Sequence, residues 1–183
     1  MRALLPTALL TLAAALPLSA GPAPLRVVPA LDLDRYAGTW YEVARLPNRF
    51  QKQCAGDVVA VYRPRPDGRI TVTNRCRTTS GGSDTATGIA RRVEGQPPSI
   101  LQVRFAPAFL SFLSAVWGDY QVIALGEAYD DAVVGTPDRQ FLWVLSRTPS
   151  MAPARYRRLL DDAKGQGFDV TKVAETPQAR AGT

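Results

Sequence analysis

Residues 31–50 read LDLDRYAGTWYEVARLPNRF, and the centre of this stretch is Gly38-Thr39-Trp40. A short acidic turn comes first, then a glycine, and then an aromatic-rich segment that is typical of a β-strand. A tryptophan at the start of a strand can fill the floor of a β-barrel, but it can equally be an ordinary buried side chain. The rest of the chain has to decide between these two interpretations.

The first twenty residues have the pattern of a secretory signal peptide. Arg2 supplies a positive start, residues 4–18 form an apolar run, and the small residue Ala20 ends the segment. The run is too short and wrongly flanked for a membrane span. We expect cleavage after Ala20. Because no cysteine lies near that site, we expect a periplasmic or secreted protein without a lipid anchor.

The remaining chain is long enough for one domain with a hydrophobic core. We expect a proline-rich flexible tether over residues 21–30, a barrel domain over residues 31–175 and a disordered tail over residues 176–183.

The composition excludes several classes of site. The 183-residue chain has no histidine, which removes His-based catalytic triads, His-ligated haem and most zinc sites, and we expect neither a metal nor another cofactor. The net charge is +6, but the arginines are scattered, whereas a nucleic-acid-binding protein would cluster them with aromatic residues. A solvated surface is the simpler interpretation, and weak attraction to anionic lipid headgroups is the alternative.

The two cysteines are Cys54 and Cys76. In an exported protein such a pair indicates one disulfide. The alternative is a nucleophilic or redox thiol, which would make the protein an enzyme; we expect that it is not one.

After Gly38 the chain divides into short alternating segments separated by turn signals, which is the pattern of an all-β barrel or sandwich. Eight strands are predicted, over residues 39–46, 57–63, 69–77, 85–93, 100–105, 119–125, 128–134 and 140–147. The tail then changes to a helical period, with apolar residues at Tyr156, Leu159, Leu160 and Ala163. Ser150 is the predicted cap of this helix, Gly165 its end, and residues 168–173 a short ninth strand.

Alternation places one apolar face of most strands in the interior. Strands 39–46 and 140–147 are apolar on both faces, so they need cover on the outside, which the amphipathic helix can supply. An eight-stranded barrel is either filled by side chains or holds one small ligand. The inward set mixes small residues with aromatics, which favours a cavity.

Strand order makes two predictions about the ends of the barrel. If the strands alternate in direction, the last one ends where the first began, so Arg147 lies near Trp40 and its guanidinium can stack on the indole. Cys54 and Cys76 both fall at the opposite end, where they can form the disulfide.

Several of these residues resemble the motifs of the lipocalins. Gly38 and Trp40 match the first motif, Gly118-Asp119-Tyr120 partly matches the second, and Arg147 matches the third. Residues 120–125 and 135–149 look like the bacterial, Blc-type group, which is related to apolipoprotein D. The resemblance implies an all-β, eight-stranded, up-and-down antiparallel barrel with one C-terminal α-helix packed outside. It also implies lipid binding in the bacterial envelope, with fatty acids or lysophospholipids as ligands, although some members are anchored lipoproteins.

The main functional hypothesis is reversible binding of a single-chain amphiphile. The residues predicted to bind the lipid tail are Tyr62, Phe105, Tyr120, Val122 and Trp143. Glu42 could meet a cationic headgroup, or it could pair with an interior arginine or with water. Trp143 could equally serve packing alone.

The apolar segment with Phe109, Phe112 and Trp117 stands where a polar loop is expected. An exposed apolar patch marks an interaction surface. We expect the segment to touch a membrane or to control ligand access, and burial in a homodimer interface is the alternative. Two other functions stay open: an enzyme that uses a free cysteine, and a scaffold or envelope-stress protein with a filled barrel.

Overall fold

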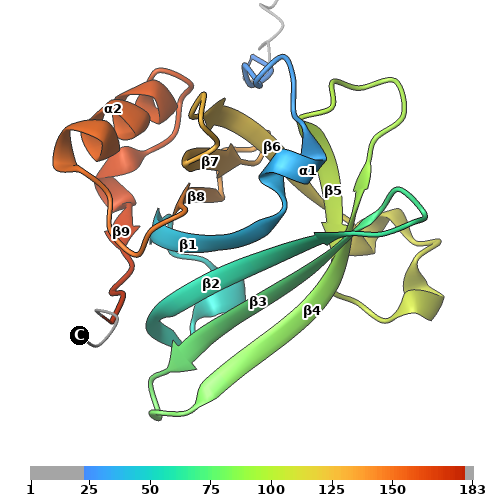
Figure 1. The fold of residues 1–183 in the computed structure, drawn as a ribbon, viewed down its shortest axis with the longest axis horizontal. Coiled ribbons are helices and arrows are strands. Elements are labelled where there is room, and N and C mark those ends of the chain that lie inside the picture. The colour runs from blue at the N-terminus through green and yellow to red at the C-terminus, as the bar shows by residue number, and fades with distance from the viewer. Residues whose placement is uncertain (1–22, 180–183) are drawn as a thin grey trace, which may run out of the picture.

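Alternating apolar residues produce strands that each follow the previous one around a barrel. A computed structural model describes residues 23–179, and Figure 1 shows the strands curving around a common interior. The strands are β1 (Gly38–Arg45), β2 (Cys54–Pro64), β3 (Ile70–Thr78), β4 (Ser83–Arg92), β5 (Ile100–Arg104), β6 (Gly118–Leu125), β7 (Asp131–Gly135), β8 (Leu142–Ser146) and β9 (Ala174–Glu175). All neighbouring strands from β1 to β8 are antiparallel, and β8 returns to β1, which closes the sheet. The predicted eight-stranded up-and-down barrel is therefore confirmed.

The helices are short except for one. They are α1 (Leu33–Tyr36), α2 (Pro153–Lys164) and the 3₁₀ turns η1 (Arg49–Gln51), η2 (Ala108–Leu110), η3 (Ser114–Val116) and η4 (Val170–Lys172). Within residues 23–179 we find no helix whose length and apolar character would let it cross a membrane.

The hydrophobic core has two parts that share the barrel wall. The first part lies inside the barrel and consists of inward-facing side chains such as Val72 and Leu101. The second part lies between the barrel and α2, where Leu159 of the helix is buried among outward-facing residues such as Val144. Figure 1 shows α2 against the side of the barrel near β7, β8 and β1. The predicted external cover of the strands with two apolar faces is thus confirmed.

Three local predictions were wrong. The strand predicted over residues 128–134 is β7, which begins only at Asp131, because Tyr129 has a φ of +59° and the chain turns there. The N-cap position of α2 is Ala152 and not Ser150, and no side chain there makes a capping hydrogen bond. The helix opens with Pro153, which has no backbone N–H to satisfy. Residues 168–173 form no strand; Phe168 is buried against β7, and η4 follows it.

Part of the segment before α1 packs on the barrel. The predicted tether spans residues 21–30, and its first two residues, like the predicted signal peptide, lie outside the described residues. Leu25 is buried, and the backbone N–H of Val28 donates to the carbonyl oxygen of Val122 at 3.0 Å. The hydroxyl of Ser99 donates to the carbonyl oxygen of Val28. These contacts hold residues 25–28 against the wall.

Part of the predicted disordered tail also contacts the barrel. Thr176 is buried, and its backbone N–H donates to the carbonyl oxygen of Val43 at 2.8 Å. The Gln178 side chain donates to the carbonyl oxygens of Glu42 and Val58. Residues 180–183 lie outside the described part of the chain.

Candidate ligand-binding cavity

Trp40 closes one end of the barrel, which we call the floor. Its side chain is fully buried, and its indole N–H donates to the carbonyl oxygen of Tyr36 at 2.8 Å. The guanidinium carbon of Arg147 lies 3.9 Å from the centroid of the Trp40 ring, the arrangement that strand order predicts. Burial lowers the pKa of Arg147, but its ordinary value is so high that the group stays charged at neutral pH.

Gly38 lets the chain enter β1 at the floor. Its φ of +94° is in the left-handed region that favours glycine, and a Cβ there would lie 3.4 Å from a guanidinium nitrogen of Arg147. The glycine, tryptophan and arginine of the predicted floor motif therefore depend on one another sterically.

Between the floor and the opposite end, which we call the mouth, the barrel encloses a cavity of about 760 Å³. Its walls are formed by the inward faces of β1 to β8. Most lining side chains in the barrel interior are apolar or aromatic: Val58, Ala60, Tyr62, Val72, Val103, Tyr120, Val134, Trp143 and Leu145. A cavity of this size and lining suits one small hydrophobic ligand and argues against a filled barrel.

The mouth is formed by the loops that follow β1, β3, β5 and β7. Phe50 and Phe105 line the cavity there and are 58% and 43% exposed, so this end is open to solvent. The predicted disulfide is confirmed: Cys54 and Cys76 are bonded, with Cα atoms 5.6 Å apart, and both line the cavity. The bond ties the start of β2 to the end of β3 beside the mouth.

Near the floor, three tyrosine hydroxyls form a short hydrogen-bonded chain. The Tyr120 oxygen lies 2.7 Å from that of Tyr36 and 3.0 Å from that of Tyr62. All three residues are buried, and burial raises the pKa of each hydroxyl, that of Tyr62 to about 12. The hydroxyls therefore stay protonated and neutral at physiological pH.

Glu42 is a buried carboxylate in the cavity wall, only 3% exposed. One of its oxygens accepts hydrogen bonds from the Arg45 guanidinium and the Thr176 hydroxyl, and the other accepts from the Gln51 amide at 2.6 Å. The side-chain amide oxygen of Gln51 in turn accepts from the Trp143 indole N–H at 2.9 Å. This arrangement favours the alternative in which Glu42 pairs with an interior arginine over contact with a headgroup.

The remaining predicted tail-binding residues differ in position. Tyr62, Tyr120 and Trp143 line the cavity. Val122 is fully buried in the packed core of the floor and does not line the cavity. Phe105 lies at the mouth and not deep in the barrel, because β5 ends at Arg104.

Three residues at the mouth were not among the predicted ligand-binding residues: Phe50, Gln51 and Phe141, the last of which shares a face of the predicted strand 140–147 with Trp143. Phe141 stacks on Trp143 with ring centroids 5.9 Å apart, and Phe50 packs on Phe141 at 5.5 Å. Gln51 holds the Trp143 indole. Phe50 and Gln51 lie in the single 3₁₀ turn η1 after β1, which is too short for a periodic pattern to indicate which side chains turn inward.

The apolar loop between β5 and β6 divides into an exposed and a packed part. Phe109 and Phe112 are 74% and 79% exposed. Trp117, predicted to act with them, is half-buried and lines the cavity, and the guanidinium carbons of Arg91 and Arg104 lie 3.8 and 5.3 Å from its ring centroid. Phe109 and Phe112, with the less exposed Leu113 at 41%, therefore form the outer apolar face of this loop.

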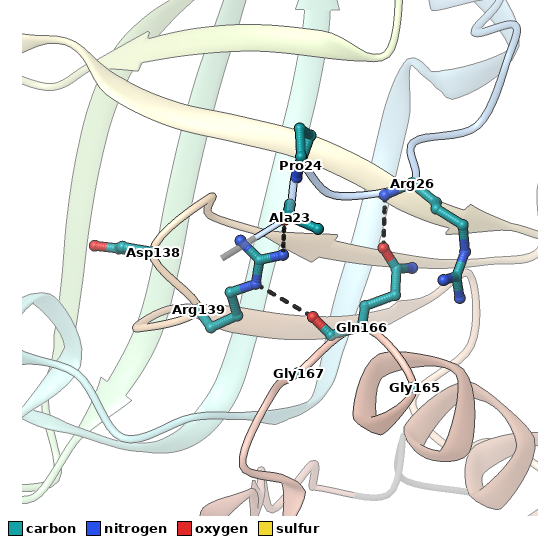
Figure 2. A pocket seen from close by; sticks show the side chains of 8 residues that line it. All are labelled: Ala23, Pro24, Arg26, Asp138, Arg139, Gly165, Gln166 and Gly167. Carbon is teal, nitrogen blue, oxygen red and sulfur yellow. Dashed lines mark hydrogen bonds between the residues drawn. The ribbon is translucent and has the colours of Figure 1, made fainter. Parts of the chain in front are cut away.

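A second hollow, of about 470 Å³, lies outside the barrel, between the N-terminal segment and the end of α2. Figure 2 shows Arg139 at its centre, donating to the carbonyl oxygens of Ala23 and Gln166, while the Arg26 N–H donates to the Gln166 side chain. These bonds join three segments of the chain around the hollow.

Comparison with known proteins agrees with this geometry. Residues 31–178 match the family model described as "Lipocalin-like domain". Temperature-induced lipocalin-1 of Arabidopsis thaliana is 37% identical over 157 residues, which cover 85% of this chain and 83% of the relative. Outer membrane lipoprotein Blc of Escherichia coli K12 is 37% identical over 151 residues, covering 82% and 81%.

Among solved structures, insecticyanin from the tobacco hornworm Manduca sexta superposes with a TM-score of 0.67 at 18% identity, covering 87% of each chain. That likeness supports the fold alone. The sequence relatives, the family model and the Trp40–Arg147 floor together identify the chain as a member of the lipocalin family, of the Blc type.

Proposed function

We propose that the protein reversibly binds and carries a single-chain amphiphile, of the fatty acid or lysophospholipid class, in the bacterial cell envelope. Its role there would be lipid storage, transport or membrane maintenance. The observation that carries the proposal is the cavity of about 760 Å³, which is mostly apolar in the barrel interior and open at one end. Binding of small hydrophobic ligands is the general activity of the lipocalin family.

The apolar wall predicts how affinity depends on the ligand. Each CH₂ group removed from water contributes about 0.8 kcal/mol, which is about fourfold in the dissociation constant. In a titration of saturated fatty acids, affinity is expected to rise about fourfold per added CH₂ until the cavity is full. An affinity that is independent of chain length would contradict the proposal.

A cavity-filling variant gives a second test. Ala60 lines the cavity, while its neighbour Val61 on β2 points to the other face of the sheet. Ala60→Phe is expected to weaken fatty-acid binding at least tenfold because the added ring occupies the space of the chain. Val61→Phe is the matched control and is expected to bind as the wild type does. Equal binding by both variants would place the ligand elsewhere.

The exposed part of the β5–β6 loop supports contact with a lipid membrane beside the mouth, where a lipid would be collected or delivered. Phe109 and Phe112 present two large apolar side chains to solvent. The double variant Phe109→Ser/Phe112→Ser is expected to reduce partitioning onto phospholipid vesicles without changing fatty-acid affinity. Unchanged partitioning, together with a wild-type dimer that the variant loses in sedimentation experiments, would favour the homodimer interface instead. A wild type that sediments as a monomer would exclude that interface.

An exported location follows from the signal-peptide pattern, and the Blc relatives are named outer membrane lipoproteins. For this chain the proposal is a periplasmic or secreted protein without a lipid anchor. The intact mass of the mature protein from envelope fractions tests this, since an acylated N-terminus would add the mass of its lipid.

The enzymatic alternative required a free thiol. Both cysteines of the chain are in the disulfide, which leaves no thiolate as a nucleophile. A thiol titration of the native protein is expected to find no reactive thiol. Two reactive thiols per chain would restore the alternative.

A further inference from the structure

The three floor tyrosines leave one hydroxyl hydrogen over. Three hydroxyls carry three hydrogens, and their two contacts, Tyr36 with Tyr120 and Tyr120 with Tyr62, use one hydrogen each whichever oxygen donates. Across residues 23–179 these oxygens make no other hydrogen bond. The remaining hydrogen faces the cavity when it belongs to Tyr62 or Tyr120, because these two line it and Tyr36 does not.

We propose that this hydroxyl hydrogen binds a neutral oxygen at the end of the ligand that enters the barrel first, such as an alcohol, ketone or ester oxygen. The inference rests on the proposed function, because it concerns the inner end of the same ligand. A methyl end would leave a buried donor without a partner, whereas an oxygen there would replace the hydrogen bond that it loses to water.

The surroundings of the floor favour a neutral oxygen over a carboxylate. Arg147, the cation at the floor, does not line the cavity and donates to the backbone carbonyl oxygens of Arg35, Thr39 and Tyr129. A carboxylate held by one hydroxyl would lose its hydration without a charged partner, which is far more costly than burying a neutral oxygen. The acid group of a fatty acid therefore stays at the mouth, and its other end reaches the tyrosines.

The donor persists under physiological conditions. Burial raises the pKa of Tyr62 and of Tyr120 above the ordinary tyrosine value, so neither hydroxyl loses its hydrogen near neutral pH.

The test compares two ligands that differ by one oxygen at the inner end: hexadecanoic acid and 16-hydroxyhexadecanoic acid, with the 12- and 14-carbon pairs as a length series. In the wild type the two dissociation constants are expected to agree within about threefold at the length that reaches the floor. In Tyr62→Phe/Tyr120→Phe the hydroxy acid is expected to bind at least tenfold more weakly than the plain acid, because its hydroxyl finds no partner.

Two further variants sharpen the comparison. Tyr62→Phe alone leaves two hydroxyls and one contact, hence still one hydrogen over, so it is expected to keep the wild-type ratio. Tyr156→Phe, on helix α2 outside the barrel, is the control because this residue does not line the cavity. A wild-type ratio above tenfold at every chain length, or a ratio that the double variant leaves unchanged, would overturn the inference while plain fatty acids still bind. If the wild type binds neither ligand, the proposed function itself fails.

A second measurement does not need the double variant to fold. With 15-oxohexadecanoic acid carrying a carbon-13 ketone, the infrared carbonyl stretch in the wild-type complex is expected below its value in an apolar solvent, as for a hydrogen-bonded ketone. A stretch at the apolar-solvent value would show that no donor reaches the inner end.

Discussion

At the residue scale, Arg147 does more than stack on Trp40. Its three hydrogen-bonded carbonyl oxygens belong to residues of α1, β1 and the turn between β6 and β7. A planar guanidinium can reach three acceptors at once, whereas an ammonium group on a lysine stem has neither the reach nor the fork. One side chain thus joins the first and last parts of the barrel at the floor.

Arg147→Lys is expected to lower the free energy of unfolding by about 1–3 kcal/mol, since the three carbonyl oxygens lose their guanidinium donor and each hydrogen bond contributes roughly 0.5–1.5 kcal/mol. Urea unfolding followed by tryptophan fluorescence measures this change. Arg92→Lys, on an exposed position of β4, is the control and is expected within about 0.5 kcal/mol of the wild type. An unchanged Arg147→Lys midpoint would show that the floor does not depend on the guanidinium.

The three floor tyrosines also predict how stability depends on pH. Their folded-state pKa values are raised, so the unfolded chain loses these protons at lower pH than the folded protein does. Their contribution is therefore complete below about pH 10 and is lost as the pH rises toward the folded value, about 12 for Tyr62.

The free energy of unfolding is expected to fall above pH 10 by roughly 1 kcal/mol per pH unit for each hydroxyl. Urea unfolding at a series of pH values measures the slope, and tyrosinate absorbance follows the ionisation. The variant Tyr36→Phe/Tyr62→Phe/Tyr120→Phe is expected to have a shallower slope. Equal slopes would show that these hydroxyls are not the groups involved.

At the element scale, the C-terminal segment completes the wall where two strands separate. β1 pairs with β2 only as far as Tyr41 and Val59, and beyond this point it pairs with β9. The backbone N–H of Asp57 donates to the carbonyl oxygen of Pro177, and a Cβ on Gly56 would lie 2.5 Å from that oxygen. Residues 174–178 therefore fit between β1 and β2 beside the cavity.

Thr176→Val is expected to destabilise the protein by about 1–3 kcal/mol, because the buried Glu42 carboxylate loses a hydrogen bond from the Thr176 hydroxyl. Thermal unfolding measures the loss. Thr171→Val, which removes an exposed hydroxyl that bonds Asp169, is the matched control. Equal melting temperatures for the two variants would show that the segment contributes nothing to closure.

What the sequence could predict depends on periodicity. The barrel strands and the helix repeat with fixed periods, so their positions, the Trp40–Arg147 contact and the disulfide could be predicted from strand order. The contacts of Thr176 and Gln51 could not be predicted in this way. Both residues lie in segments too short to show a period, and both reach Glu42 only through the tertiary fold. Val122 shows another limit: alternation identifies the inward face but not the depth at which packing ends and the cavity begins.

At the scale of the whole molecule, the two ends of the barrel are secured differently. Packed aromatic rings and Arg147 close the floor, whereas the disulfide joins β2 to β3 at the mouth and leaves the opening free. The densely packed end of the cavity is thus the end that would contact the ligand tail.

The disulfide links residues 22 positions apart, and its loss is expected to lower the free energy of unfolding by about 3 kcal/mol through the greater entropy of the unfolded chain. Chemical denaturation of Cys54→Ser/Cys76→Ser measures this. Fatty-acid affinity is expected to change little at temperatures where the variant is folded. A large loss of affinity would mean that the bond shapes the cavity as well as stabilising the barrel.

Native mass spectrometry of protein freshly purified from cell envelopes tests the lipid-carrier proposal most directly. The expected result is a population with one bound molecule per barrel, which collisional activation releases at the mass of a fatty acid or a lysophospholipid. The Ala60→Phe variant is expected to carry less of it. A barrel that is always empty, and that takes up no fatty acid when saturated with it in solution, would contradict lipid carriage and favour a scaffold role.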